Sequence, residues 1–236
     1  MNLYNKLKKY SIKDAIYFEE NDRQFLALQK LYKNKKFSDE LYLFLIIANS
    51  LICYQLSWKW EDYWEEFSSE LENKNFKNFE EIYKFFEKFL KSSKNNKRFV
   101  ETKLKRIKKL VAFLEGEERI VWIEKFEFYY KNMDKLAEKL AKIMNQKKDA
   151  KTIVFAVKMF SYWARNVFSY LEKFPKNLMI PIDSRLENLY KLETWKIDFN
   201  KKEIKEFYID LSKKLDIPLL HLDAILWVNY DELIKE

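Results

Sequence analysis

The sequence predicts an all-α protein, and its composition is the main reason. Glycine occurs once and proline three times in 236 residues. Hairpin turns and glycine-rich phosphate loops need glycine, because its backbone adopts a positive φ without steric cost. The other residues alternate apolar stretches at helical spacing with short polar breaks. Because 48% of the residues are hydrophobic, a large core is possible. We expect about ten helices joined by polar turns.

Capping residues and polar breaks place the expected helices in order. Ser38, Asp149 and Asp183 are suitable N-caps, and Gly116 is a suitable C-cap. The connection over residues 145–148 is short and polar, so the two helices that it joins have the outline of a helix–hairpin–helix. The expected ranges are 38–57, 61–70, 78–90, 102–114, 134–144, 150–171, 183–190, 202–215 and 219–228.

The cysteine and histidine counts exclude several kinds of site. Cys53 is the only cysteine and His221 the only histidine. A disulfide framework, an iron–sulfur cluster and a cysteine-based zinc site are therefore excluded. Neither an HExxH motif nor a nucleophile elbow is present, and we expect His221 to be structural or at the surface. The apolar runs are too short to cross a bilayer, so we expect a soluble cytoplasmic protein.

The charge balance favours a polyanionic partner. The formal net charge is +8, and basic proteins most often bind nucleic acid. A basic cluster stands out in the helix expected over 102–114. We interpret this cluster as a solvated helix face, with phosphate contact as the alternative. Its members are Lys103, Lys105, Arg106, Lys108 and Lys109.

Two lysines lie in the otherwise apolar helix expected from residue 150. Lys151, Phe155 and Lys158 are spaced to share one helix face. Burial and the dipole of the first helical turn both disfavour a charged Lys151. A neutral lysine is an amine nucleophile, so this pattern favours covalent amine chemistry. The alternative is that Lys151 extends from the helix start into solvent.

Three further residues are candidates for chemistry or binding. Asp183 follows an apolar loop, and an acid fixed as a helix N-cap can still stabilise a developing cation. Asp223 and Trp227 are four residues apart in an apolar helix, so they share a face. An indole beside a carboxylate can serve as a stacking wall. The alternative is that these residues are structural, with Asp223 bonded to backbone amides and Trp227 in the core.

The segments 149–158, 180–185 and 220–227 together resemble the archaeal 8-oxoguanine DNA glycosylase (AGOG) family. This family is a divergent branch of the helix–hairpin–helix DNA glycosylases. The 32-residue separation of Lys151 and Asp183 and the Asp-x3-Trp motif at residues 223–227 are specific to that branch. The resemblance spans nearly the whole chain.

This resemblance implies a fold and its subdivision. It implies an all-α, helix–hairpin–helix glycosylase-like fold with two packed helical subdomains and a cleft between them. Residues 1–236 would form one helical unit. The hairpin and nucleophile region would span about 133–171 and the catalytic acid loop about 178–186. The N- and C-terminal helices would complete the base pocket.

The resemblance also implies roles for individual residues. Lys151 matches the Schiff-base nucleophile and Asp183 the catalytic acid. In the base pocket, Phe155 and Trp227 match the two stacking faces. The polar contacts to the purine match Lys158, Asp223 and Gln24. Pro181 matches a residue that lines the pocket, and Trp64 matches the tryptophan of an N-terminal motif. Gln29 is the alternative to Gln24.

The chain departs from the family pattern in the glycine-free connection over residues 145–148. It also departs near Cys53, which stands where a serine is expected, and over residues 57–60, where Ser-Trp-Lys-Trp replaces a glycine-containing turn.

The implied activity is that of a bifunctional DNA N-glycosylase and AP lyase. It would flip out 8-oxoguanine, excise it through a lysine Schiff base and cleave the strand by β-elimination. The expected partner is double- or single-stranded DNA containing 8-oxoguanine, at the nucleoid, with no metal, organic cofactor, membrane or obligatory protein partner. Gln24, a backbone carbonyl or Asp223 can accept the N7–H of the lesion. Two alternatives remain: a non-catalytic helical binding module, and a monofunctional glycosylase in which Asp183 activates water.

Overall fold

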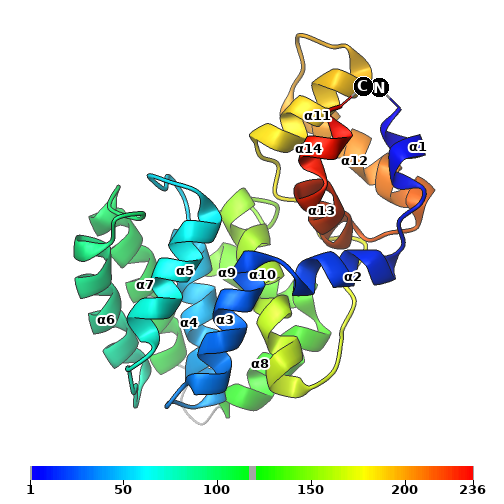
Figure 1. Ribbon diagram of the computed structural model, residues 1–236. Helices are drawn as coiled ribbons and strands as arrows, with labels where there is room; N and C mark the ends of the chain where they lie inside the picture. Colours follow the sequence, from blue (N-terminus) through cyan, green and yellow to red (C-terminus); the bar gives the residue numbers. More distant parts are fainter. Residues whose placement is uncertain (1, 117–120, 236) are drawn as a thin grey trace. The chain divides into compact units, whose positions relative to one another are not determined.

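The computed structural model describes residues 2–116 and 121–235, and this part of the chain contains helices and no strands (Figure 1). The all-α prediction is therefore confirmed. Fourteen helices are present in the described ranges, more than the expected ten, since the shortest are only four or five residues long and show no periodicity. The chain divides into two compact units. Unit 1 comprises residues 1–22 and 173–236, and unit 2 comprises residues 23–172.

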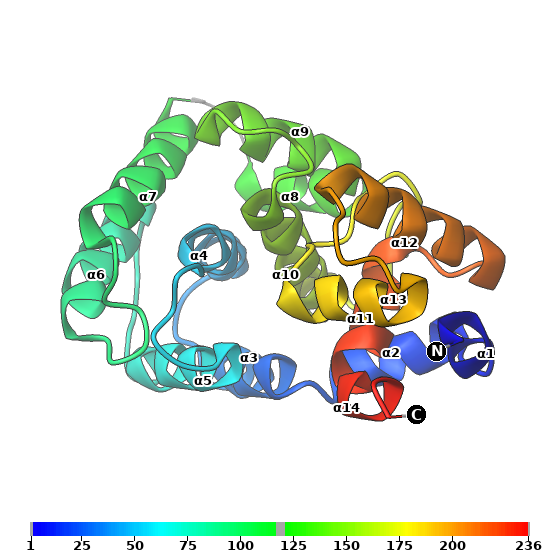
Figure 2. The same ribbon diagram turned by 90° about the horizontal axis from the view of Figure 1, so that it is seen from above.

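Unit 2 is built around α4, Asp39–Ile52, in which every residue from Leu41 onward is buried. It packs against α10, Lys151–Phe168, whose residues 153–165 are also buried. Figure 2 shows α4 nearly end-on, with α6 and α7 on one side and α10 on the other. The remaining helices of the unit are α3 (Arg23–Asn34), α5 (Trp60–Leu71), α6 (Phe79–Ser92), α7 (Val100–Glu115), α8 (Trp122–Lys131) and α9 (Met133–Met144).

The helix expected over 38–57 ends five residues early, at Ile52. Cys53 leaves the helical conformation with φ −78° and ψ 69°, and Gln55 takes a positive φ of 51°. Beyond this point Ser57 N donates to Asn95 O at 2.8 Å, so the backbone turns towards the segment before α7. Because α4 ends at Ile52, residues 53–59 form a non-helical connection to Trp60, the first residue of α5.

The hairpin between α9 and α10 turns without glycine. Asn145 takes the left-handed conformation, with φ 51° and ψ 52°. Gln146 N donates to Ala141 O at 2.9 Å and Asn145 N donates to Lys142 O at 3.2 Å. These are the two bonds of a Schellman motif, in which asparagine tolerates the position that glycine usually takes.

Asp149 does not cap α10, which corrects the sequence prediction. The N-cap is Ala150, whose backbone is extended and whose carbonyl accepts from Ile153 N at 2.9 Å and Val154 N at 3.0 Å. Ala150 has no side-chain oxygen that could accept from the amides of the first turn. The first turn of α10 places the positive end of the helix dipole at Lys151.

Unit 1 has its own apolar core, centred on α13, Leu219–Val228, in which residues 219–226 are buried. α2, Ile12–Glu20, packs against it and contributes Glu19. Its other helices are α1 (Leu3–Leu7), α11 (Ser184–Thr194), α12 (Lys201–Leu215) and α14 (Tyr230–Leu233).

The sequence predicts that His221 is structural or at the surface, and it is fully buried in unit 1. Its Nδ1 lies 2.8 Å from Glu19 Oε1, and its Nε2 accepts from Phe174 N at 3.3 Å. Because Nε2 accepts, the hydrogen of a neutral ring lies on Nδ1 and donates to Glu19. Within the described ranges, no helix combines the length and apolarity that crossing a bilayer requires.

Candidate functional site

The predicted site residues fall into two groups, one in each unit. Unit 2 contains Gln24, Cys53, Trp64, Lys151, Phe155 and Lys158. Unit 1 contains Pro181, Asp183, Asp223 and Trp227. The geometry of each group is given within its own unit.

Lys151 is the first residue of α10, and its side chain is exposed. The prediction of a desolvated Lys151 is therefore wrong, because the first turn of the helix lies outside the buried stretch that begins at Ile153. Its ammonium nitrogen lies over an aromatic face instead: Lys151 Nζ is 5.5 Å from the centroid of the Trp60 ring. Such a face attracts a cation at this atom through the ring quadrupole.

Phe155 lies one turn after Lys151 and meets two indoles of α5. Its ring centroid is 4.7 Å from that of Trp60 in an edge-to-face contact and 6.4 Å from that of Trp64. Phe155 is 8% exposed and Trp64 is fully buried. The structure thus brings Lys151, Phe155 and Trp64 together. It adds Trp60, which the sequence analysis did not select although it lies in an unusual Trp-Lys-Trp turn.

Cys53 is buried at the C-terminal end of α4. Burial raises the pKa of its thiol well above the ordinary value, although the charge of Lys103 acts in the opposite direction. Cys53 is therefore a neutral thiol rather than a reactive thiolate. Where the family resemblance predicts a serine, the chain has a small neutral side chain with weaker hydrogen-bonding capacity.

Lys103 corrects the interpretation of the basic cluster as a solvated face. It is fully buried, its Nζ donates to Asn96 Oδ1, and it lies 4.8 Å from the centroid of the Tyr54 ring. Burial lowers the pKa of Lys103 to about 8. Arg106 is half-buried, whereas the other three members of the cluster are exposed: Lys105, Lys108 and Lys109.

The two expected polar contacts of unit 2 are buried. Gln24 in α3 is 5% exposed, whereas the alternative, Gln29, is half-exposed. Lys158 is 8% exposed, and its Nζ lies 5.5 Å from the centroid of the Tyr162 ring. Of the two lysines in α10, Lys158 is therefore the one that fits the prediction of burial.

Asp183 is the N-cap of α11 in unit 1, as predicted. Its Oδ1 accepts from Arg185 N at 3.1 Å and from Leu186 N at 3.0 Å. Both bonds end on the same oxygen, so Oδ2 takes no part in the cap. Pro181, two residues earlier, is buried.

Trp227 is half-buried near the end of α13, and Arg185 stacks on it. The guanidinium carbon of Arg185 is 3.7 Å from the centroid of the Trp227 ring and 5.6 Å from that of Tyr230. One face of the indole is thereby covered by a planar cation. Asp223, one turn earlier in α13, is 6% exposed. The sequence analysis did not select Arg185, although it follows Asp183 by two residues.

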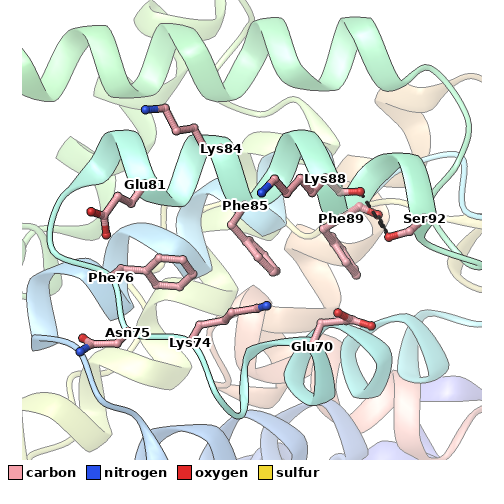
Figure 3. A pocket seen from close by; sticks show the side chains of 10 residues that line it. All are labelled: Glu70, Lys74, Asn75, Phe76, Glu81, Lys84, Phe85, Lys88, Phe89 and Ser92. Carbon is pink, nitrogen blue, oxygen red and sulfur yellow. Dashed lines mark hydrogen bonds between the residues drawn. The ribbon is translucent and has the colours of Figure 1, made fainter.

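Outside these two groups, the described residues form a pocket but no cluster that could hold a metal ion. In the described ranges, no three His, Cys, Asp or Glu side chains lie together so as to hold a metal ion. A pocket of about 300 Å³ lies between the end of α5 and α6, and none of the predicted site residues lines it. Figure 3 shows its wall of Phe76, Phe85 and Phe89, with lysine and glutamate side chains around it.

Comparisons with known proteins agree on one group of enzymes. The family described as AGOG, N-glycosylase/DNA lyase, matches residues 4–236. The N-glycosylase/DNA lyase of Methanococcus maripaludis is 40% identical over 209 residues, covering 89% of this chain and 78% of the relative. That of Nanoarchaeum equitans is 39% identical, covering 94% and 86%.

A solved structure shares the fold. The crystal structure of 8-oxoguanosine-complexed AGOG, an 8-oxoguanine DNA glycosylase from Pyrobaculum aerophilum, matches with a TM-score of 0.78 and 23% identity. The match covers 97% of this chain and 86% of that chain.

Proposed function

Because the chain belongs to the AGOG family of N-glycosylase/DNA lyases, we propose that it excises 8-oxoguanine from DNA through Lys151. The family membership confirms the resemblance found in the sequence, and DNA glycosylase activity follows from it. The lesion and the covalent route belong to the proposal. The observation that carries them is the position of Lys151, which is exposed at the first turn of α10 with its Nζ over the ring of Trp60, and that ring in turn contacts Phe155.

A base within a duplex must be flipped out before its glycosidic bond can be attacked. In unit 2, Phe155 would offer one stacking face, and in unit 1, Trp227 would offer another. Stacking on an aromatic side chain contributes roughly 1–3 kcal/mol per base. This would offset part of the cost of unstacking.

Selectivity would come from the N7–H group, which 8-oxoguanine has and guanine lacks. A buried acceptor that bonds this hydrogen loses that bond when guanine is present, and such a loss discriminates strongly. The buried Gln24 and Asp223, or a backbone carbonyl, would provide the acceptor. Lys158 and Pro181 are assigned to the remaining contacts with the purine, and Cys53 and Trp64 to the wall behind Phe155.

The reaction would proceed in three steps: displacement of the base, opening of the sugar ring and β-elimination. Lys151 Nζ, once its ammonium has given up a proton to solvent, bonds to C1′ while the C1′–N9 bond breaks, and the departing base takes up a proton. Asp183 would stabilise the positive charge that develops on the sugar. Opening of the sugar ring then gives an iminium at Nζ. The iminium acidifies the C2′ hydrogen, and loss of this proton expels the 3′ phosphate by β-elimination.

The backbone grip on DNA would come from the hairpin. Its connection has the exposed Lys147 and Lys148 in place of glycines. The start of α10 adds the positive end of a helix dipole. We propose that these groups hold phosphates of double- or single-stranded DNA in the cytoplasm, with no obligatory protein partner.

The proposed function is tested with two duplexes that differ only in one 8-oxoguanine. The expected result is release of the oxidised base followed by strand cleavage on its 3′ side, with the guanine duplex intact. Binding without base release would favour the non-catalytic module. Base release that leaves an uncut abasic strand would favour a monofunctional glycosylase.

A further inference from the structure

Arg106 of α7 bonds both ends of the hairpin connection that precedes Lys151. Its Nη2 donates to Gln146 Oε1 at 2.9 Å and to Thr152 Oγ1 at 3.1 Å. Thr152 Oγ1 in turn donates to Gln146 Oε1 at 3.1 Å. The three side chains therefore form a closed triangle of hydrogen bonds.

This triangle spans the elements that place Lys151. Gln146 is the residue after the left-handed Asn145, and Thr152 is the residue after Lys151. Ala150, the N-cap of α10, provides no side-chain bond that would fix the helix start. The hairpin is also free of glycine, so its shape depends on the Asn145 turn and on side-chain contacts. Arg106 joins the two sides of this connection from a different helix.

Arg106 is itself held in place. It is half-buried, and its guanidinium carbon lies 5.5 Å from the centroid of the Tyr54 ring. Burial lowers the pKa of Arg106, but a guanidinium stays protonated at neutral pH. A planar guanidinium, whose N–H directions are fixed, holds the two acceptors of its Nη2 more rigidly than a lysine would.

We propose that Arg106 is a positioning residue for the reaction: through Gln146 and Thr152 it fixes the start of α10 and so aims Lys151. This inference rests on the proposed function, in which Lys151 is the nucleophile. An amine must lie in a near-attack position, and a displacement of about 1 Å can cost about a hundredfold in rate. The competing role for a basic residue near the hairpin is a direct contact with a DNA phosphate.

Single-turnover kinetics and salt dependence separate these roles. We expect Arg106→Gln and Thr152→Val each to lower the excision rate at saturating enzyme by about ten- to a hundredfold. In the double variant the losses should be smaller than their product, because both changes open the same triangle. The slope of log affinity against log salt for undamaged duplex should stay unchanged. Arg98→Gln is the matched control, since Arg98 is exposed just before α7, and it should leave the excision rate unchanged.

Two results would overturn the inference. If the rate of Arg106→Gln is unchanged and its salt slope falls by about 0.9, Arg106 is a phosphate contact. If neither rate nor slope changes in any variant, Arg106 only supports the fold. If Arg106→Gln loses its cooperative melting transition, the variant is not folded and the excision rate of Thr152→Val alone tests the inference. Wild-type protein that fails to excise 8-oxoguanine would instead refute the proposed function.

Discussion

Lys151 Nζ lies over the ring of Trp60, and the edge-to-face contact of that ring with Phe155 joins the start of α5 to the start of α10. A cation at Nζ is stabilised by the ring, whether it is the resting ammonium or the iminium of the proposed intermediate. The face that stabilises the intermediate is thus already in place in the free chain.

Loss of the Trp60 ring should therefore weaken the lyase step. A cation–π contact contributes about 0.5–2 kcal/mol, so Trp60→Leu should lower the yield of borohydride-trapped complex about two- to thirtyfold. Trp60→Phe should retain an intermediate yield. Trp58 lies in the same turn and is 70% exposed, so Trp58→Leu is the control. Equal yields of trapped complex from Trp60→Leu and Trp58→Leu would show that the Trp60 ring does not stabilise the intermediate.

The stacked pair of Arg185 and Trp227 predicts a graded effect on lesion binding. Trp227→Ala should weaken binding of 8-oxoguanine duplex by roughly 1–3 kcal/mol, the value of one stacked base. Arg185→Leu should give a smaller loss, because the ring remains but no longer carries the guanidinium on one face. Affinity for undamaged duplex should barely change with Trp227→Ala, since it depends on backbone contacts.

The control for Trp227→Ala is Trp195→Ala, because Trp195 is 76% exposed at the end of α11. This variant should bind 8-oxoguanine duplex as the wild type does. The measurement is the ratio of damaged to undamaged affinity. If Trp227→Ala keeps the wild-type ratio and only lowers the melting temperature, Trp227 is a packing residue.

Asp183→Asn should separate catalysis from folding. Asparagine is as good an N-cap as aspartate, so the melting temperature should change little. Excision should fall by roughly 10²–10⁴, as expected when a group that handles charge at the reacting centre is lost. The reverse exchange at the cap of α12, Asn200→Asp, should affect neither quantity. Wild-type excision in Asp183→Asn would reduce Asp183 to a cap.

The buried Lys103 predicts a pH dependence of stability. In the folded chain its amine loses the proton near pH 8, whereas in the unfolded chain it does so near 10.5. Between these values the unfolded state binds more protons, so the free energy of unfolding rises with pH. Below pH 8 the lysine is charged in both states and carries the full cost of burial.

Lys103→Met removes this titration. The difference in the free energy of unfolding between wild type and variant, measured in urea from pH 7 to 10.5, should therefore shift in favour of wild type as the pH rises. A difference that is constant over this range would mean that Lys103 titrates like an exposed lysine.

Composition and periodicity predicted the helices of the core, because burial of one face imposes a regular spacing on the sequence. The range 219–228 agrees with α13, and Asp183 caps α11, as expected because aspartate is a favoured N-cap. Gly116, by contrast, ends α7 with φ −76°, so its backbone conformation does not require glycine, although a Cβ there would lie 3.2 Å from Ala112 O.

Side-chain environments were harder to predict because they depend on neighbours distant in sequence. Lys103 and Lys105 look alike within one helix, yet only Lys103 is buried, beside Asn96 and Tyr54. Lys151 was expected to be buried because α10 is apolar, but the helix start is uncovered. The contact with Trp60 depends on the early end of α4, which periodicity alone did not predict.

The measurement that tests the central claim most directly is borohydride trapping of Lys151→Gln on 8-oxoguanine duplex. The account predicts no trapped complex, with lesion binding and the melting temperature retained. The control is Lys148→Gln, which removes an exposed lysine from the hairpin connection and should still give a trapped complex. A full yield of trapped complex from Lys151→Gln would show that another amine, such as Lys158, is the nucleophile, and would contradict the account.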